Sequence, residues 1–279
     1  MSAGGISIAS DITWLGIFGY RFFQNALLGG TLAAAACAWV GVFLILRRES
    51  MLGDGVAHTA FGGIALGLLL GISPLLAALA VSIVAVLGIA YMKKKGLANS
   101  DSAIAVIMAM GFALGLIIIS LAGGFNVELF SYLFGSILTI GTEDLLIVSA
   151  LALVTLAFLG TFYKELMSMT FDEEAARMTG IPVQAMAVVF NILVATTIVV
   201  SIKVIGIILV TALMIIPGLT ALQLKLSFRR TVTAAVGFGV LATVLGLILS
   251  SLYSIATSGV IVFTAVAMFA FIATYRRLG

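Results

Sequence analysis

Residues 47–74 read RRESMLGDGVAHTAFGGIALGLLLGISP: two arginines, a short polar turn, and an apolar run over 56–72 that ends at a Ser-Pro pair. A second apolar run follows at once, over 74–92, and ends at three consecutive lysines. Uninterrupted apolar stretches of this kind are typical of α-helices that cross a bilayer, which need about 20 residues. They do not resemble the short alternating strands of a membrane barrel.

The same pattern extends through the chain and predicts an all-α, polytopic transmembrane helix bundle that forms one domain over 1–279. Of the 279 residues, 63% are hydrophobic and only 9% are charged, whereas soluble domains carry about 25% charged residues. The stretch 125–141 is shorter and contains Glu128, which favours a re-entrant or interfacial helix. The nine apolar runs lie at 22–46, 56–72, 74–92, 102–122, 145–163, 183–202, 204–224, 231–253 and 258–275.

Composition also limits the function classes. Cys37 is the only cysteine, so an intrachain disulfide is not possible. The first twenty residues lack the basic start of a signal peptide, because Asp11 is the only charge before Arg21. The sequence pI of about 9.1 does not indicate nucleic-acid binding, since the basic residues stand in ones, twos and threes between apolar runs.

The basic residues predict the orientation. If the N-terminus lies outside and the C-terminus inside, every Lys and Arg except Arg21 and Lys203 falls on the cytoplasmic side. Nine spans give this one-sided distribution of basic residues. If one early span were absent, every later loop would change sides and the basic residues would be distributed over both sides of the membrane. The break between the sixth and seventh spans, predicted at 202–204, is marked by Lys203 alone.

The longest cytoplasmic connection, 164–182, is predicted to contain a helix of two to three turns. Thr170 fits the N-cap of a capping box with Glu173, Gly180 fits the C-terminal stop, and Pro182 blocks continuation. Phe171, Ala175 and Met178 lie on one side of this helix. So short a helix is marginal alone, which indicates either a cytoplasmic partner or a capped loop resting on lipid headgroups.

The second span carries the candidate metal ligands. Asp54 and His58 are four residues apart, so they share a helix face, and His58 is the only histidine. Ionisable groups in membrane segments are costly and usually functional, and a carboxylate with an imidazole suits manganese, iron or zinc. Two ligands are too few for a tight site, but a two-fold dimer would supply four. The alternative is that Asp54 caps the helix and His58 reaches the headgroups.

Two further features of the spans concern packing. A row of small residues recurs every fourth position beside Asp54 and His58, which predicts close packing of the second span against other helices. Pro217 lies within the seventh run and predicts a helix kink there. The small residues of the row are Gly55, Thr59, Gly63, Gly67 and Gly71.

Four segments resemble, in order, the zinc/manganese/iron-type ABC transporter permeases. The stretch 47–74 resembles the family's signature, although many members have a proline where this chain has Gly62. YLFGSIL (132–138) matches its short loop helix, and VIGIILVTALMIIPGLTALQL (204–224) its late helix with a central proline. FDEEAARMTGIP (171–182) is similar to its coupling segment, including the E-A-A-x-x-x-G consensus from Glu174 to Gly180.

The resemblance implies a homodimeric importer subunit in a bacterial or archaeal plasma membrane, with no permanently bound cofactor. Its partners would be a second copy of itself, cytoplasmic ABC ATPase subunits and an extracytoplasmic metal-binding protein. Asp54 and His58 would bind the transported divalent metal. Asp172, Glu173, Glu174, Ala175 and Gly180 would form the ATPase contact.

Rival functions remain open at this stage. A permease for metal chelates or cobalamin would not require Asp54 and His58, and an ion-coupled secondary carrier would not use an ATPase contact. An intramembrane enzyme is not indicated, because no H-E-x-x-H motif is present. The chain also lacks a P-loop motif, so ATP hydrolysis is expected on a separate subunit.

Overall fold

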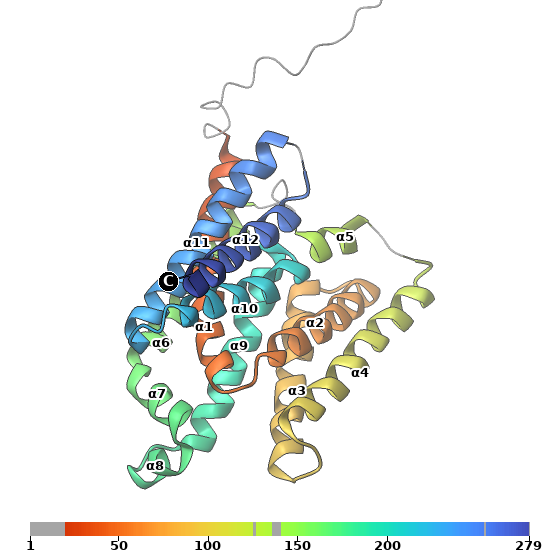
Figure 1. Cartoon of the computed structure of the whole chain (residues 1–279). Helices are drawn as coiled ribbons and strands as arrows, with labels where there is room; N and C mark the ends of the chain where they lie inside the picture. Colours follow the sequence, from red (N-terminus) through yellow and green to blue (C-terminus); the bar gives the residue numbers. More distant parts are fainter. Residues whose placement is uncertain (1–19, 125–126, 136–140, 254, 279) are drawn as a thin grey trace, which may run out of the picture.

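The computed structural model describes residues 20–124, 127–135, 141–253 and 255–278, and its regular structure there is entirely helical (Figure 1). The predictions for 1–19 and 136–140 lie outside the described residues. The helices are α1 (Arg21–Leu46), α2 (Met51–Leu70), α3 (Pro74–Lys94), α4 (Ser100–Leu121), α5 (Val127–Phe134), α6 (Thr142–Thr161), α7 (Tyr163–Phe171), α8 (Glu173–Met178), α9 (Val183–Ile205), α10 (Ile207–Gln223), α11 (Phe228–Tyr253) and α12 (Thr257–Leu278).

The predicted all-α bundle is confirmed, with one apolar helix for each predicted span. Eight described helices are long and apolar enough to cross a membrane: α1, α2, α3, α4, α6, α9, α11 and α12. The remaining apolar helix, α10, has 17 residues and is about 25 Å long, slightly shorter than a typical hydrocarbon core of about 30 Å. Of the eight, α2 and α1 are the most buried and α12 the least.

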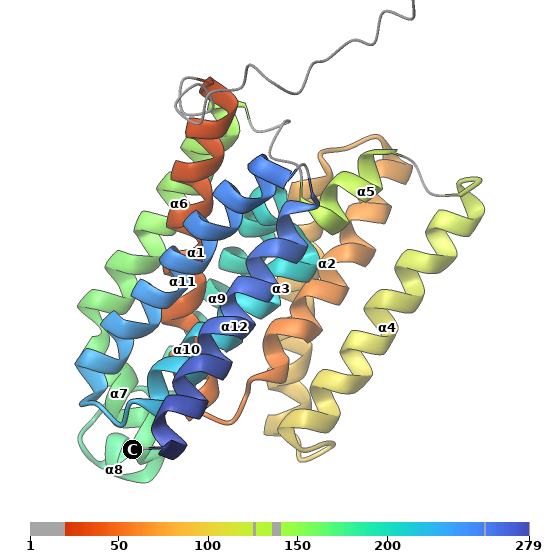
Figure 2. The same cartoon turned by 45° about the horizontal axis from the view of Figure 1, so that its top comes forward.

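The two ends of the bundle carry different short helices. The start of α1 and the short helix α5 lie at one end, whereas α7, α8 and the end of α12 lie at the other (Figure 2). Helix α10 joins the two ends. Its N-terminal neighbour Gly206 packs against Gly135, just after α5, and Phe228, which follows α10, contacts Phe171 at the end of α7. The first helix starts at one end of the bundle and the last helix finishes at the other (Figure 2), which is consistent with an odd number of membrane crossings.

The break between the sixth and seventh spans is not where the sequence analysis placed it. Lys203 lies in the last turn of α9, and the chain turns instead at Gly206, which has φ 83° and ψ 160°. This combination is essentially restricted to glycine. Lys203 is accommodated because its ammonium group forms an ion pair with Asp144 in the first turn of α6.

The row of small residues on α2 packs closely, as predicted, but against two helices. A Cβ on Gly55 would lie 2.8 Å from Ile104 of α4, and one on Gly63 would lie 2.5 Å from the Cα of Ala78 in α3. Gly71 does not belong to this contact: it is the C-cap residue, with φ 67° and open space around it. Helix α2 is thus wedged between α3 and α4.

Pro217 lies inside α10, which continues beyond it to Gln223. The proline is buried, and the neighbouring Gly218 approaches α1, where an added Cβ would lie 2.7 Å from Ile45. Small residues at such contacts let neighbouring helices cover the backbone that proline leaves unpaired. The kink at Pro217 stays a prediction.

Candidate metal site and coupling segment

Asp54 and His58 lie on the first two turns of α2, on its least buried side. Both are half-buried, whereas most residues between Leu52 and Gly67 are buried against the neighbouring helices. The four-residue spacing places the carboxylate and the imidazole on one helix face, as predicted. Close packing of the opposite faces therefore leaves these two side chains as the polar edge of a central helix.

Among the residues that the structure describes, neither Asp54 nor His58 forms an ion pair, and the His58 ring is held by aromatic contacts. The His58 ring stands edge-to-face on Phe112 of α4, with 5.1 Å between ring centroids, and Phe112 also contacts Phe61 at 5.5 Å. These aromatic contacts orient the imidazole plane. An oriented imidazole with a neighbouring carboxylate is a suitable partial ligand set for a transition-metal ion.

The alternative role of Asp54 as a helix cap does not agree with the structure. Helix α2 begins at Met51, and Ser50 occupies the N-cap position. Asp54 lies one turn further on, where its charge is favourable to the helix dipole but where it does not replace a capping side chain.

One chain does not complete a metal site. In the part of the chain that the structure describes, no group of three or more His, Cys, Asp or Glu side chains gathers in a way that could hold a metal ion. Asp54 and His58 would provide two ligands, fewer than the four typical of a bound transition-metal ion such as zinc. A metal ion bound by this pair would need further ligands from another molecule or from water.

The predicted coupling segment forms a short capped helix, α8, and the structure corrects the predicted cap. Asp172 is the N-cap residue, and its Oδ1 accepts a hydrogen bond of 2.9 Å from the Ala175 backbone N–H. Thr170, the predicted N-cap, lies inside α7, where its hydroxyl donates to the Leu166 carbonyl oxygen at 2.6 Å. Helix α8 has six residues and is therefore shorter than the two to three turns predicted.

The end of α8 agrees with the prediction. Gly180 has φ 87°, and the Ile181 N–H donates to the Ala176 carbonyl oxygen at 3.2 Å, which is the pattern of a glycine-terminated helix. Ala176 is fully buried and fixes one side of the helix to the protein. The other side is exposed, including Glu174 and Ala175.

The exposed side of α8 carries apolar side chains that the chain itself does not cover. Met178 is 90% exposed and Phe171, just before the cap, is 64% exposed. An ion pair of 2.6 Å between Glu173 and Arg177 borders them. Exposed apolar side chains of this kind mark a contact surface, either for another protein or for the membrane surface.

Aromatic side chains connect α7 to the rest of the bundle. Phe228, the first residue of α11, contacts Phe171 at 6.0 Å, Tyr163 at 5.3 Å and Phe43 of α1 at 5.4 Å between ring centroids. Burial raises the pKa of the Tyr163 phenol, and the nearby charge of Arg229 partly offsets this. Tyr163 is therefore neutral near pH 7 and packs as an aromatic ring.

The sequence analysis missed a polar cluster close to the start of α2. Glu49 is buried and forms ion pairs with Arg47 and Lys93. The only sequence feature that pointed to this cluster was a single carboxylate, Glu49, between an arginine pair and the start of a helix. Its partner Lys93 is 44 residues away in the sequence, so local pattern could not identify the pairing.

Comparison with known proteins places this arrangement in a family. The sequence profile of the ABC 3 transport family matches residues 19–276. The chain belongs to the ABC 3 transport family. The resemblance noted in the sequence is thereby confirmed at the level of the family.

Members of the family with known names are similar over nearly the whole chain. The manganese transport system membrane protein MntC of Halalkalibacterium halodurans is 32% identical over 91% of this chain and 87% of its own length. The high-affinity zinc uptake system membrane protein ZnuB of Haemophilus influenzae is 31% identical over 90% of this chain and 96% of its own.

A solved structure has the same fold. The structure described as PsaBC from Streptococcus pneumoniae in complex with Fab superposes with a TM-score of 0.83 and is 31% identical, covering 93% of this chain and 94% of that chain. This member of the ABC 3 transport family is therefore a multi-helix membrane protein of that fold.

Proposed function

We propose that this chain is the membrane-spanning permease subunit of an ATP-driven importer for a divalent transition-metal ion: manganese, zinc or iron. The observation that carries the proposal is the pair Asp54 and His58, half-buried on one face of a helix that is otherwise wedged into the bundle. Relatives named for manganese and zinc transport, each over 30% identical, support the same substrate class.

The ligand set is completed by a second copy of the chain. Two copies related by a two-fold axis bring two carboxylates and two imidazoles to one seam, which suits the charge and the ligand number of a bound dication. Metal delivered by an extracytoplasmic binding protein reaches this seam from outside. Alternating access across the seam then releases it to the cytoplasm.

ATP hydrolysis takes place on a separate ABC ATPase subunit that contacts α8. The exposed apolar side chain of Met178 belongs to α8 and that of Phe171 lies just before its cap, and Glu174, Ala175 and Gly180 belong to the same segment. A movement imposed on α8 is transmitted to α11 and α1 through the ring contacts of Phe228. In this proposal α8 and the C-terminus lie in the cytoplasm and the start of α1 lies outside.

Reconstituted transport tests the function directly. The complex of this chain with its ATPase is placed in liposomes, the binding protein is supplied outside, and entry of radioactive manganese, zinc and iron is measured with and without MgATP. We expect ATP-dependent uptake of at least one of these ions. Uptake driven by an ion gradient without ATP would indicate a secondary carrier, and uptake only of a chelate or cobalamin would indicate that rival class; either result contradicts the proposal.

A further inference from the structure

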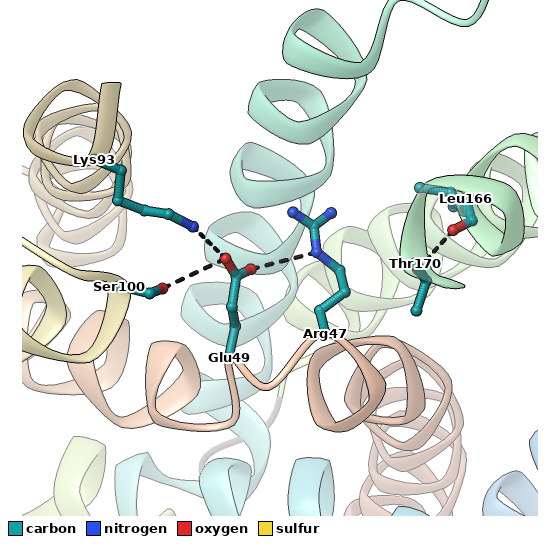
Figure 3. Close-up of polar contacts among 6 residues, drawn as sticks. All are labelled: Arg47, Glu49, Lys93, Ser100, Leu166 and Thr170. Atoms are coloured by element: carbon teal, nitrogen blue, oxygen red, sulfur yellow. Dashed lines mark hydrogen bonds and ion pairs between the residues drawn. The ribbon is translucent and has the colours of Figure 1, made fainter. Parts of the chain in front are cut away.

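A buried carboxylate lies at the corner between α1 and α2. Glu49 is only 6% exposed, and its Oε2 lies 3.4 Å from Arg47 Nε at the end of α1. Its Oε1 forms an ion pair with Lys93 in the last turn of α3 and accepts a hydrogen bond of 3.5 Å from the Ser100 hydroxyl at the start of α4 (Figure 3). One side chain therefore connects the ends of three helices.

The backbone of the same corner is also held on both sides. The Glu49 N–H donates to the Leu44 carbonyl oxygen, and the Glu49 carbonyl oxygen accepts from the Leu52 N–H, each at 2.9 Å. Between the helices, Arg48 has φ 57°, a conformation that a residue with a side chain adopts only where the surroundings determine it. The corner thus has one defined geometry.

The ion cluster is anchored further by an aromatic contact. The Arg47 guanidinium lies over the Phe190 ring of α9, with 5.4 Å from Cζ to the ring centroid. Phe190 is fully buried and contacts Phe43 of α1 at 6.1 Å. Because a cation over an aromatic face is attracted to it, Arg47 has a fixed place from which to hold Glu49.

Helix α2 begins two residues after Glu49, and its first two turns carry Asp54 and His58. A rotation or tilt of α2 at this corner would move both candidate ligands together. A metal site tolerates little displacement, because ligands have to be held within about 0.5 Å of their productive positions.

We propose that Glu49 is a positioning residue for the metal site: it fixes the start of α2 against α1, α3 and α4 and thereby holds Asp54 and His58 in place. This inference rests on the proposed function, since it assumes that Asp54 and His58 bind the transported metal. Glu49 itself does not touch the metal and acts through the helix that follows it.

The chain offers a matched control. Asp101 and Glu49 both line a polar cleft of about 470 Å³ at this end of the bundle. Asp101 is exposed and has no ion pair within the described residues. Asp101→Asn therefore removes one negative charge from the same cleft without breaking a buried pair.

The test is Mn²⁺ binding to the purified full complex, measured from the electron paramagnetic resonance signal of free Mn²⁺, with Zn²⁺ as competitor. Glu49→Gln keeps the size of the side chain and removes its charge, and we expect the Kd for Mn²⁺ to rise by about tenfold, the lower end of what supporting contacts of metal ligands contribute. Glu49→Asp keeps the charge and restores most of the affinity. Asp101→Asn binds as the wild type does.

Wild-type affinity in Glu49→Gln, or the same loss in Asp101→Asn, would overturn the inference. A lowered unfolding temperature with unchanged Mn²⁺ affinity would make Glu49 a structural residue only. If Glu49→Gln does not assemble, the ion-pair partner Lys93 is substituted instead. The inference then requires that Lys93→Met weakens Mn²⁺ binding and that Lys93→Arg preserves it.

The two proposals fail in different ways. If Mn²⁺ and Zn²⁺ do not bind to the wild-type complex, or bind equally well to Asp54→Asn, the metal site itself is wrong and the role of Glu49 falls with it. If binding depends on Asp54 but not on Glu49 or Lys93, only the positioning role is wrong.

Discussion

Gly206 and Gly135 meet backbone to backbone. A Cβ on Gly206 would lie 2.5 Å from the carbonyl carbon of Phe134, and a Cβ on Gly135 would lie 2.7 Å from that of Ile205. Both glycines have positive φ, 83° and 71°. This contact seats the end of α5 on the break between α9 and α10, at the end of the bundle opposite α8.

The first prediction concerns this contact. Gly206→Ala places a methyl group against backbone atoms and forces a conformation that only glycine adopts, so we expect a loss of about 2 kcal/mol or more in stability. Thermal unfolding of the purified complex measures it. Gly160→Ala, within α6, is the control, because an added Cβ there meets nothing within 4 Å. Equal unfolding temperatures for the two variants would contradict the close contact.

The second prediction concerns the corrected cap of α8. Asp172→Ala removes the hydrogen bond to the Ala175 N–H, which is worth about 1 kcal/mol for a helix this dependent on its cap. We expect fewer metal ions transported per ATP hydrolysed in liposomes, and near-normal coupling in Asp172→Asn. Thr170→Val is the control, since Thr170 only donates to its own helix. Stronger uncoupling by Thr170→Val than by Asp172→Ala would show that Thr170, and not Asp172, is the N-cap residue that matters.

The third prediction concerns transmission from α8. Phe228→Ala removes the ring that contacts both Phe171 and Phe43. We expect ATP hydrolysis to continue while metal uptake falls severalfold, because the lost aromatic pairs contribute about 0.5–1.5 kcal/mol each to this packing. Phe263→Ala is the matched control, with a side chain that is 79% exposed in the single chain. A proportional loss of hydrolysis and uptake would indicate misfolding rather than uncoupling.

The fourth prediction concerns orientation. In a Cys37→Ala background, Met178→Cys places an exposed thiol on α8, and Tyr20→Cys places one just before α1. A membrane-impermeant maleimide added to intact cells is expected to label position 20 and to label position 178 only after lysis. Labelling of position 178 from outside would invert the proposed topology.

Sequence pattern predicted the helices well, because each span needs an apolar run and basic residues mark the ends. It misplaced the α9–α10 break because a lysine inside an apolar run resembles a boundary, whereas Lys203 is paired with Asp144, 59 residues away. The backbone conformation that stops α9 belongs to Gly206, and its contact with Gly135 is also long-range.

The candidate functional segments show the same limit. Spacing correctly placed Asp54 and His58 on one face of α2 and Gly180 at the end of α8, because each of these relationships is local to one helix. Thr170 and Asp172 both fit a cap pattern, and only the end of α7 distinguishes them. Glu49 depends on partners from α1, α3 and α4, which local sequence does not bring together.

The central claim is that Asp54 acts as a charged ligand of the transported metal. ATP-dependent metal uptake by liposomes containing the Asp54→Asn complex tests it most directly, because asparagine keeps the size of the side chain and removes the carboxylate charge. Asp101→Asn is the control. Asp54 lies in the first turn of α2 and Asp101 in the first turn of α4, so each substitution removes the same favourable interaction with a helix dipole. The account predicts that Asp54→Asn assembles and hydrolyses ATP but does not take up metal, while Asp101→Asn transports normally; wild-type uptake by Asp54→Asn would contradict it.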